Sequence, residues 1–294
     1  MRLRTILVPT DFGVSATAAW RYAKVLARRF NARLHVLHVI STPYLYDAWG
    51  TQSIAMQMVD LQAQLERDSR QELKRMAAQS GPLGRRITTS TVTGTTVDSV
   101  LTYIAAKHID LVVMGTHGRR GLQKVLLGSV AEKVLRGASC PVLTVGPCVH
   151  LGAECAAEMK RILFATDFSA ASEAATAYAL SLAQENQAVL DVVHIVEPRN
   201  PGEVINSAEL VSGYAARMRS LIPADSEFWC EANSLIEVGQ PAEQILNVAK
   251  ARRSQLIVLG VKAASNLTAA AHLPWAIAHK ILSAAECPVF TVRG

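Results

Sequence analysis

A glycine-rich segment at residues 114–130 holds residue types that can bind a phosphate group. Gly115 and Gly118 allow positive φ angles and let backbone N–H groups approach an anion with no Cβ in the way. Gly128 and Ser129 open a segment with helical periodicity, so the free N–H groups of that helix face the same space. The spacing therefore predicts an anion site built from backbone amides.

Side chains of the same segment leave two interpretations open. Positive charge comes from Arg119, Arg120 and Lys124, which suits a polyphosphate. The Ser129 hydroxyl can contact a phosphate oxygen or cap its own helix. A glycine-rich turn before a capped helix would show the same pattern with no ligand, so the segment alone favours nucleotide binding only slightly.

A second polar group, made of Pro9, Thr10 and Asp11, closes the first apolar run. Ligands of open parallel sheets bind beyond the carboxyl ends of the strands, and both this group and the 114–130 segment fall there. Asp11 also stands where it can cap the next helix. Its counterpart Asp167 keeps the same sequence context, which favours a structural contribution at both positions.

The elements that position these residues occur twice. Matched blocks follow the same order in both halves: RTILVPTDF (4–12) with RILFATDF (161–168), ARLHVLHVI (32–40) with AVLDVVHIV (188–196), HIDLVVMG (108–115) with SQLIVLG (254–260), and SCPVLTV (139–145) with ECPVFTV (286–292). Self-similarity of this extent indicates a duplication. We expect a first domain at 1–147, a linker at 148–157 and a second domain at 158–294.

Each half alternates unbroken apolar runs with segments of helical period. In the first half the expected strands lie near 3–9, 33–40, 86–93, 109–115 and 141–146, and the expected helices near 15–30, 53–78, 96–107 and 128–137. Strands that are apolar throughout are typical of a parallel sheet covered on both faces. The fold class is therefore α/β, with two tandem open parallel-sheet domains of the Rossmann-like kind.

The spacing Gly-x2-Gly-x9-Gly-Ser from Gly115, with Pro-Thr-Asp after the first strand and Cys-Pro-Val before the fifth, resembles the universal stress protein family. The stretch GTHGRRGLQKVLLGSVAEKVL is similar to the ATP-binding version of that family, and the likeness spans both halves. The resemblance implies sheets of adenine-nucleotide α-hydrolase type with five strands each. It also implies that ATP, ADP or AMP binds in the first domain.

The resemblance further implies a set of contact residues at one edge of the first domain: Pro9, Thr10, Asp11, Val39, Met114, Gly115, His117, Gly118, Arg119, Gly128, Ser129 and Val130. The glycines and Ser129 would hold the phosphates and ribose, with a backbone N–H from Val130. Asp11 and Val39 would line the nucleoside end, beside a wall shaped by the two residues before Asp11. His117 either leans toward the phosphates or is an exposed loop imidazole.

The second half departs from this pattern. Counted from Gly260, the second glycine position is Ala263, and the Gly-Ser position falls on Leu273-Pro274. No glycine occurs between Gly260 and Gly294. Alanine is strained at positive φ, and proline lacks the N–H that an anion needs. We therefore predict that the second domain binds no nucleotide.

Motifs for catalysis are missing. The chain has no GxxxxGK[ST] loop, kinase HRD or DFG set, GxSxG elbow or HExxH motif. The leading hypothesis is a stress-response protein that binds ATP, with Mg²⁺ accompanying the phosphates. The alternatives are a slow ATPase that uses the same segment and an interaction scaffold without ligand. Nucleic-acid binding is disfavoured because aromatic residues make up 5% of the chain.

Composition and charge indicate where the protein is located and how it assembles. The net charge of +6 divides unevenly, since residues 1–150 hold 19 Lys and Arg against 9 Asp and Glu. No apolar run is long enough to span a membrane, and the first residues enter a strand-like run directly, so we expect a cytoplasmic protein. The fifth strands, Val142–Val145 and Val289–Val292, are expected to pair within the chain. Exposed sheet edges also favour a homodimer.

Overall fold

The computed structural model describes residues 3–41, 52–117, 127–149, 159–198, 208–222, 230–262 and 272–294; within 52–59, 208–211 and 272–274 it describes the helical backbone only. The predicted contact residues Gly118 and Arg119 lie outside these ranges, as does most of the predicted linker. The same is true of Ala263 in the second half.

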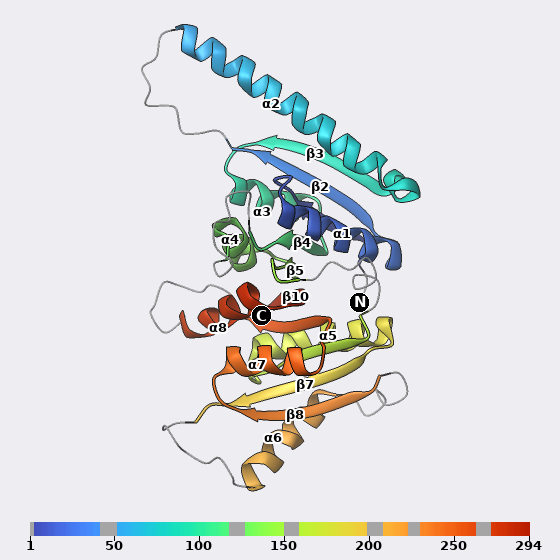
Figure 1. Ribbon diagram of the computed structural model, residues 1–294, viewed down its shortest axis with the longest axis vertical. Helices are drawn as coiled ribbons and strands as arrows, with labels where there is room; N and C mark the ends of the chain where they lie inside the picture. Colours follow the sequence, from blue (N-terminus) through green and yellow to red (C-terminus); the bar gives the residue numbers. More distant parts are fainter. Residues whose placement is uncertain are drawn as a thin grey trace.

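Both halves have the same alternation of strands and α-helices, and the first also contains a 3-10 helix, η1, among its described residues (Figure 1). The first contains β1 (Thr5–Pro9), α1 (Val14–Arg29), β2 (Arg33–Ile40), α2 (Gln52–Ala78), η1 (Gly81–Arg86), β3 (Ile87–Thr93), α3 (Thr96–Ala106), β4 (Leu111–Gly115), α4 (Ser129–Gly137) and β5 (Val142–Val145). The second contains β6 (Arg161–Ala165), α5 (Ala170–Asn186), β7 (Val189–Val196), α6 (Ala208–Leu221), β8 (Ala232–Val238), α7 (Pro241–Ala251), β9 (Leu256–Val261), α8 (His272–Ala284) and β10 (Val289–Arg293). The strands and helices expected in the first half are all present, with ends that differ by at most two residues. The fold-class prediction is confirmed.

The strands form one ten-stranded sheet with the order β3-β2-β1-β4-β5-β10-β9-β6-β7-β8. Within each half every described strand pair is parallel. The first strand of each half therefore lies between its second and fourth strands. The point where the strand order reverses, which in open sheets marks the ligand edge, falls between β1 and β4.

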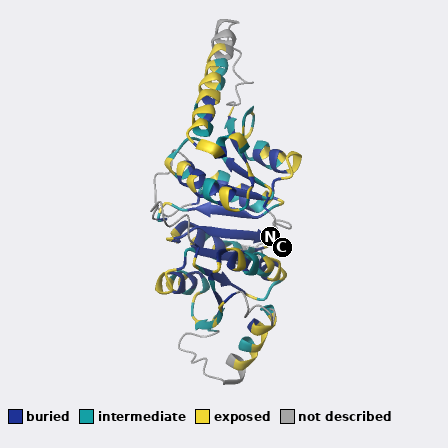
Figure 2. Cartoon of the chain, turned by 90° about the vertical axis from the view of Figure 1, so that its right-hand side faces the viewer, coloured by how far each residue is buried: buried dark blue, intermediate teal, exposed yellow. Residues whose placement is uncertain are grey.

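The two halves meet where β5 and β10 pair antiparallel. Leu143 lies opposite Phe290, its own equivalent in the repeat, so the pairing is related by an approximate twofold axis through these two residues. Side chains repeat the symmetry: the Thr144 hydroxyl donates to the Val289 carbonyl at 3.2 Å, and the Thr291 hydroxyl donates to the Val142 carbonyl at 3.0 Å. Figure 2 shows both strands buried at the middle of the molecule.

Helices cover both faces of the sheet, which explains the unbroken apolar strands. Helices α1, α2, α5 and α6 pack on one face and α3, α4, α7 and α8 on the other, each set around its own apolar cluster. Both clusters extend across the β5–β10 junction into the two halves. The consecutive residues Ile6 and Leu7 of β1 point to opposite faces of the sheet, and both are fully buried, one in each cluster.

The buried faces of α4 and α8 align the two predicted loops. Three positions match in order: Ala131, Val134 and Leu135 of α4 with Ala278, Ile281 and Leu282 of α8. In this alignment Trp275 takes the position of Gly128. The expectation that Leu273-Pro274 takes the Gly-Ser position was therefore wrong by two residues. The second loop is longer, because Gly260 to Cys287 spans 27 positions and Gly115 to Cys140 spans 25.

The starts of these helices differ as well. Helix α4 begins at Ser129, directly after Gly128, whereas α8 begins at His272, three residues before Trp275. The second domain thus has helical backbone at His272 and at the two residues after it, whereas Leu127, aligned with Pro274, lies outside α4. In a helix that begins at His272, the amides of Trp275 and Ala276 bond to carbonyls one turn earlier, so the amides aligned with Gly128 and Ser129 are not free for an anion.

Candidate nucleotide site at the carboxyl edge of the first domain

The described contact residues gather at the carboxyl ends of three adjacent strands. Pro9 ends β1, Gly115 ends β4, and Val39 is the second-last residue of β2. The register places Pro9 beside Leu37 of β2, and the Thr10 amide donates to the Leu37 carbonyl at 2.8 Å. Met114 is buried and Val39 half-buried against the cluster under α3 and α4. The residues singled out in the sequence thus lie at one edge, beside the switch point.

The turn after β1 is held by its own side chains. The Thr10 hydroxyl accepts a hydrogen bond from the Phe12 amide at 3.0 Å, and Asp11 Oδ1 accepts one from the Gly13 amide at 2.9 Å. Phe12 has a positive φ of 63°, which these bonds support. Helix α1 has Gly13 as its N-cap, without a side-chain cap. Asp11 therefore shapes the turn before the helix, so the interpretation of Asp11 as a helix cap was wrong.

Gly115 is required for packing. Its φ is not positive, contrary to the expectation from the glycine pattern. A Cβ at Gly115 would lie 2.6 Å from Ser15 Cβ and 2.8 Å from the Ser15 carbonyl oxygen, so the glycine lets β4 end against the first turn of α1. Gly260 has the same role, since its Cβ would lie 2.3 Å from the Ala171 carbonyl carbon. The glycine shared by both halves is therefore explained without a ligand.

Helix α4 begins at this edge with two kinds of amide. The Gly128 amide donates to the Thr116 carbonyl at 2.7 Å, so this N–H serves the fold. Ser129 and Val130 are the first helical residues, where a helix leaves its N–H groups without intrahelical acceptors. Ser129 is exposed and follows the N-cap, so its hydroxyl does not cap the helix. The anion-binding capacity of the described part therefore resides at Ser129 and Val130.

His117 is oriented by its neighbour. The Thr116 hydroxyl and His117 Nδ1 lie 2.8 Å apart, and Thr116 is fully buried. The Thr116 amide donates to the Val145 carbonyl at 3.2 Å, which fixes the chain at the start of the loop. The imidazole is therefore a half-buried, hydrogen-bonded group, and the interpretation of His117 as an exposed loop side chain was wrong.

The matching edge of the second domain uses its carboxylate internally. Asp167 Oδ1 accepts hydrogen bonds from the Ser169 amide at 3.0 Å, from the Ser169 hydroxyl at 2.6 Å and from the Ser172 hydroxyl. Burial alone would raise the pKa of Asp167, but these bonds outweigh it and hold the pKa below its ordinary value. The first domain has Gly13 and Ala16 at the two serine positions, so it provides no such hydroxyls to Asp11.

A histidine in each half was missed in the sequence. His38 Nδ1 lies 2.8 Å from the Thr10 carbonyl oxygen, and His194 Nδ1 lies 2.8 Å from the Thr166 carbonyl oxygen. Each ring also packs on the phenylalanine of the preceding turn, with ring centroids 4.5 Å and 4.6 Å apart. The signal was present, because both halves have a histidine near the end of the second strand. These histidines fix the turns that follow β1 and β6.

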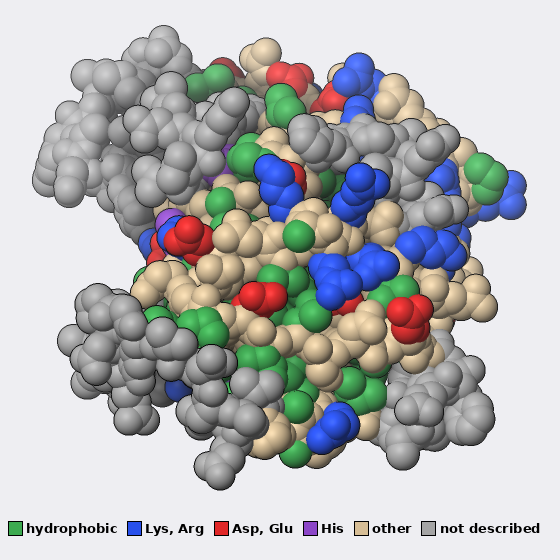
Figure 3. Space-filling model, turned by 60° about the horizontal axis from the view of Figure 1, so that its bottom comes forward, with side chains coloured by type: hydrophobic (Ala, Val, Ile, Leu, Met, Phe, Trp, Pro, Cys, Tyr) green, Lys and Arg blue, Asp and Glu red, His purple; other side chains and the backbone are tan. Residues whose placement is uncertain are grey.

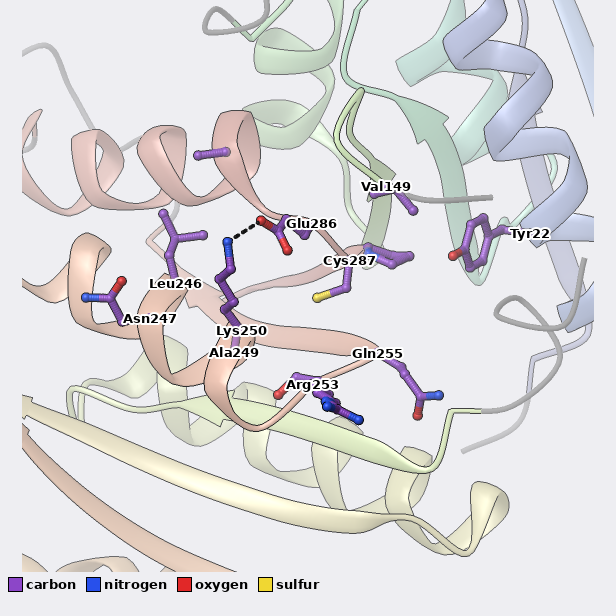
Figure 4. Close-up of a pocket in the computed structure, with 13 residues that line it drawn as sticks. Tyr22, Val149, Leu246, Asn247, Ala249, Lys250, Arg253, Gln255, Glu286 and Cys287 are labelled. Atoms are coloured by element: carbon purple, nitrogen blue, oxygen red, sulfur yellow. Dashed lines mark hydrogen bonds and ion pairs between the residues drawn. The ribbon is translucent and has the colours of Figure 1, made fainter. Parts of the chain in front are cut away.

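A cavity of about 350 Å³ lies elsewhere, at the opposite edge of the sheet. Figure 4 shows Cys287 and Arg253 around this hollow, with the Lys250–Glu286 ion pair (3.1 Å) at its rim and Tyr22 of the first domain facing it. Burial raises the pKa of the Cys287 thiol to about 12, with a further contribution from Glu286, so this thiol stays protonated and is a poor nucleophile.

A second cavity, of about 610 Å³, lies at the symmetry-related place, between the start of β5 and helix α5. This second cavity is lined by the equivalent residues Cys140, Pro141 and Tyr178, in place of Cys287, Pro288 and Tyr22. Two hollows related by the twofold axis of the sheet are a product of the way the domains pack. We therefore place the candidate functional site at the carboxyl edge and not in these cavities.

Among the described side chains on the face seen in Figure 3, Lys and Arg lie in separate groups with Asp and Glu near them. Among the described residues, no three His, Cys, Asp or Glu side chains are grouped as a metal site would require. Nor does any helix in the described part have the length and apolar character needed to cross a membrane.

The sequence profile of the Universal stress protein family matches this chain twice, at residues 2–146 and 158–293. A universal stress protein of Methanocaldococcus jannaschii is 31% identical over 144 residues, which cover 48% of this chain and 81% of the relative. One from Mycolicibacterium smegmatis is 27% identical over 306 residues, covering 98% of this chain and 96% of the relative. The chain belongs to the universal stress protein family, with two family units in tandem.

A solved structure has the same arrangement. The crystal structure of a universal stress protein from Archaeoglobus fulgidus matches with a TM-score of 0.68 at 19% identity, covering 98% of this chain and 96% of that one. At this identity the match supports the fold of the whole two-unit chain.

Proposed function

We propose that the chain binds ATP, or another adenine nucleotide, at the carboxyl edge of its first domain and acts as a nucleotide-dependent stress-response protein in the cytoplasm. The observation that carries the proposal is the start of α4. There Ser129 and Val130 present first-turn amides beside the switch point, and the equivalent start in the second domain is wound into an extra turn of α8.

The contact residues in this proposal are those of the sequence analysis, with revised roles. Ser129 and Val130 hold phosphate oxygens through their amides, and Asp11 and Val39 line the nucleoside end. Gly115 acts indirectly, by letting β4 approach α1. Mg²⁺ would be held mainly by the phosphate oxygens, because the described residues offer no acidic cluster for it.

A proline substitution tests the amide directly. In Ser129→Pro the first helical residue tolerates proline, while one N–H and the hydroxyl are both removed. The preceding Gly128 has a ψ of 141°, which a following proline accepts. Loss of one charge-assisted hydrogen bond should weaken ATP binding about tenfold or more in isothermal titration of the full chain.

Thr96→Pro is the matched control. Thr96 is the first residue of α3, and the equivalent helix α7 already begins with Pro241. We expect unchanged ATP affinity in this variant. Equal ATP affinity in Ser129→Pro and the wild type would contradict the proposal, as would an absence of ATP binding by the wild-type chain at millimolar concentration.

Two further expectations remain open to measurement. Slow hydrolysis at the same site would produce linear phosphate release that Gly118→Ala abolishes. Association of two chains would give a dimer mass in light scattering at micromolar concentration, and a strict monomer would contradict it. The nucleotide recovered by denaturing freshly purified protein would distinguish ATP from ADP and AMP.

A further inference from the structure

One side chain of the second domain reaches the helix that begins the proposed site. Trp275 Nε1 donates a hydrogen bond to Glu132 Oε1 of α4 at 3.2 Å. Arg136, one turn further along α4, forms an ion pair with the same carboxylate oxygen at 3.2 Å. The Arg136 guanidinium also lies over the Trp275 ring, 4.6 Å from its centroid. Three side chains from two domains thus contact one another in pairs; we call them the Trp275 brace.

The Trp275 brace contacts α4 near its start, at Glu132 in the first turn of the helix. The Glu132 amide donates to the Gly128 carbonyl at 2.9 Å, so Glu132 stands directly above the residues whose amides are proposed to hold phosphate. Its carboxylate is a negative charge near a site for a polyanion, which opposes binding. The Trp275 N–H and the Arg136 guanidinium both hold this carboxylate and offset its charge.

The brace is one-sided. By the alignment of α4 with α8, Trp275 occupies the position of Gly128, Glu132 that of His279, and Arg136 that of Ser283. Glycine has no side chain with which to make the reciprocal contact. The approximate twofold axis therefore provides no second brace. Among the described residues, the contact between an indole and a carboxylate of the other domain is therefore found on one side of the axis.

We propose that Trp275 is a positioning residue for the nucleotide site of the first domain: the second domain keeps the Glu132 carboxylate paired and away from bound phosphate. This inference rests on the proposed function. The second domain, without a site of its own, then completes the site of its partner domain through an indole on α8.

Two substitutions and their combination test the inference in the full chain. Trp275→Leu leaves Glu132 without its indole partner and should weaken ATP binding about fivefold in isothermal titration. Glu132→Gln removes the negative charge and should bind ATP at least as tightly as the wild type. In the double variant Glu132→Gln with Trp275→Leu, ATP affinity should return to that of Glu132→Gln alone. A merely structural role for Trp275 would not give this rescue, because a destabilised fold would weaken binding in both backgrounds.

Glu286→Gln is the control, since it breaks an exposed ion pair of the same domain at the opposite edge of the sheet, and it should leave ATP affinity unchanged. Urea midpoints of all variants show whether the fold is kept. Equal ATP affinity in Trp275→Leu and the wild type would overturn the inference while leaving the proposed function intact. Loss of affinity without rescue by Glu132→Gln would also overturn it. A wild-type chain that binds no ATP would overturn both.

Discussion

The carboxyl edges of the two domains have the same strand arrangement, but the polar groups at these edges make different hydrogen bonds. In the second domain Asp167 is surrounded by donors of its own turn, and the start of α8 is wound into a longer helix. In the first domain Asp11 accepts a hydrogen bond from the Gly13 amide, and α4 begins only at Ser129. The comparison teaches that the second domain binds its edge carboxylate with hydroxyls of its own turn and begins α8 early, whereas the first domain lacks hydroxyls at those two positions and begins α4 at Ser129.

The two domains also differ in their polar contacts at the opposite ends of the strands. A substitution there should have the largest effect on the free energy of unfolding. Asp191 is fully buried and is paired with Arg161 at 3.1 Å and Asn233 at 3.0 Å. Asp191→Ala would leave the Arg161 charge unpaired in a partly buried place and should lower the free energy of unfolding by about 3 kcal/mol in urea denaturation.

The first domain provides the control for this substitution, because it has His35 at the same position, in contact with the Tyr103 hydroxyl at 3.1 Å. His35→Ala removes a neutral contact and should lower the free energy of unfolding by about 1 kcal/mol. Equal losses in the two variants would show that the second domain does not depend more on internal polar pairing than the first.

Glycine substitutions come next and would show what the two edges share. Gly260→Ala and Gly115→Ala both drive a methyl group into the first turn of a helix, against backbone atoms that cannot rotate away. Each should lower the free energy of unfolding by about 2–3 kcal/mol. If Gly115→Ala leaves the urea midpoint unchanged, Gly115 is not a packing glycine and its phosphate role has to be reconsidered.

Transfer of the second domain's serines to the first would convert one edge toward the other. Gly13→Ser with Ala16→Ser supplies the hydroxyls that Asp167 has, and these should bind the Asp11 carboxylate. If Asp11 contacts the nucleoside, ATP affinity should fall about threefold in isothermal titration, as expected when one hydrogen bond faces competition. The reverse change, Ser172→Ala, should leave ATP affinity unaltered. An unchanged affinity in the double serine variant would restrict Asp11 to shaping its turn.

The smallest effect concerns pH. Burial lowers the pKa of His194 from its ordinary value of 6.5, with a further decrease from Arg217 that the Thr166 carbonyl and Asp167 oppose. The unfolded chain then binds a proton that the folded chain resists, so this contribution to stability is full above pH 6.5 and is lost as the pH falls toward the folded pKa. His194→Gln should flatten the decline of the urea midpoint below pH 6.5. An identical decline in both proteins would place its origin elsewhere, with His35 the first group to examine because burial lowers its pKa too.

Much of the fold was predictable because periodicity and burial agree. Strands such as β2 and β4 read as apolar runs, and α1 and α3 as helical segments, since the sheet is covered on both faces. The 3-10 helix η1 was not foreseen, because its residues Gly81–Arg86 carry no periodic pattern. The placement of Pro9, Val39 and Gly115 at one edge of the sheet was also predictable, since it follows from strand ends alone.

The roles within the site were harder to predict. The pattern around Gly115 resembles a phosphate loop, but the need for glycine arises from Ser15, which is distant in sequence and visible only in three dimensions. The alignment of Trp275 with Gly128 depends on the buried face of a helix, which a count from Gly260 ignores. Sequence spacing thus brought the described residues to one edge of the sheet, and tertiary packing decided the contacts that each of them makes there.

The pairing of β5 with β10 consumes the strand edges through which the halves could exchange partners. Because the partner is tethered, this junction forms at any dilution, and a separate single-unit relative would have to displace a covalently attached competitor in order to join it. In each chain, β5 and β10 are therefore paired with each other, and β3 and β8 remain as the outer strands of the sheet. A cell that contains several such proteins could not mix this pair with the others.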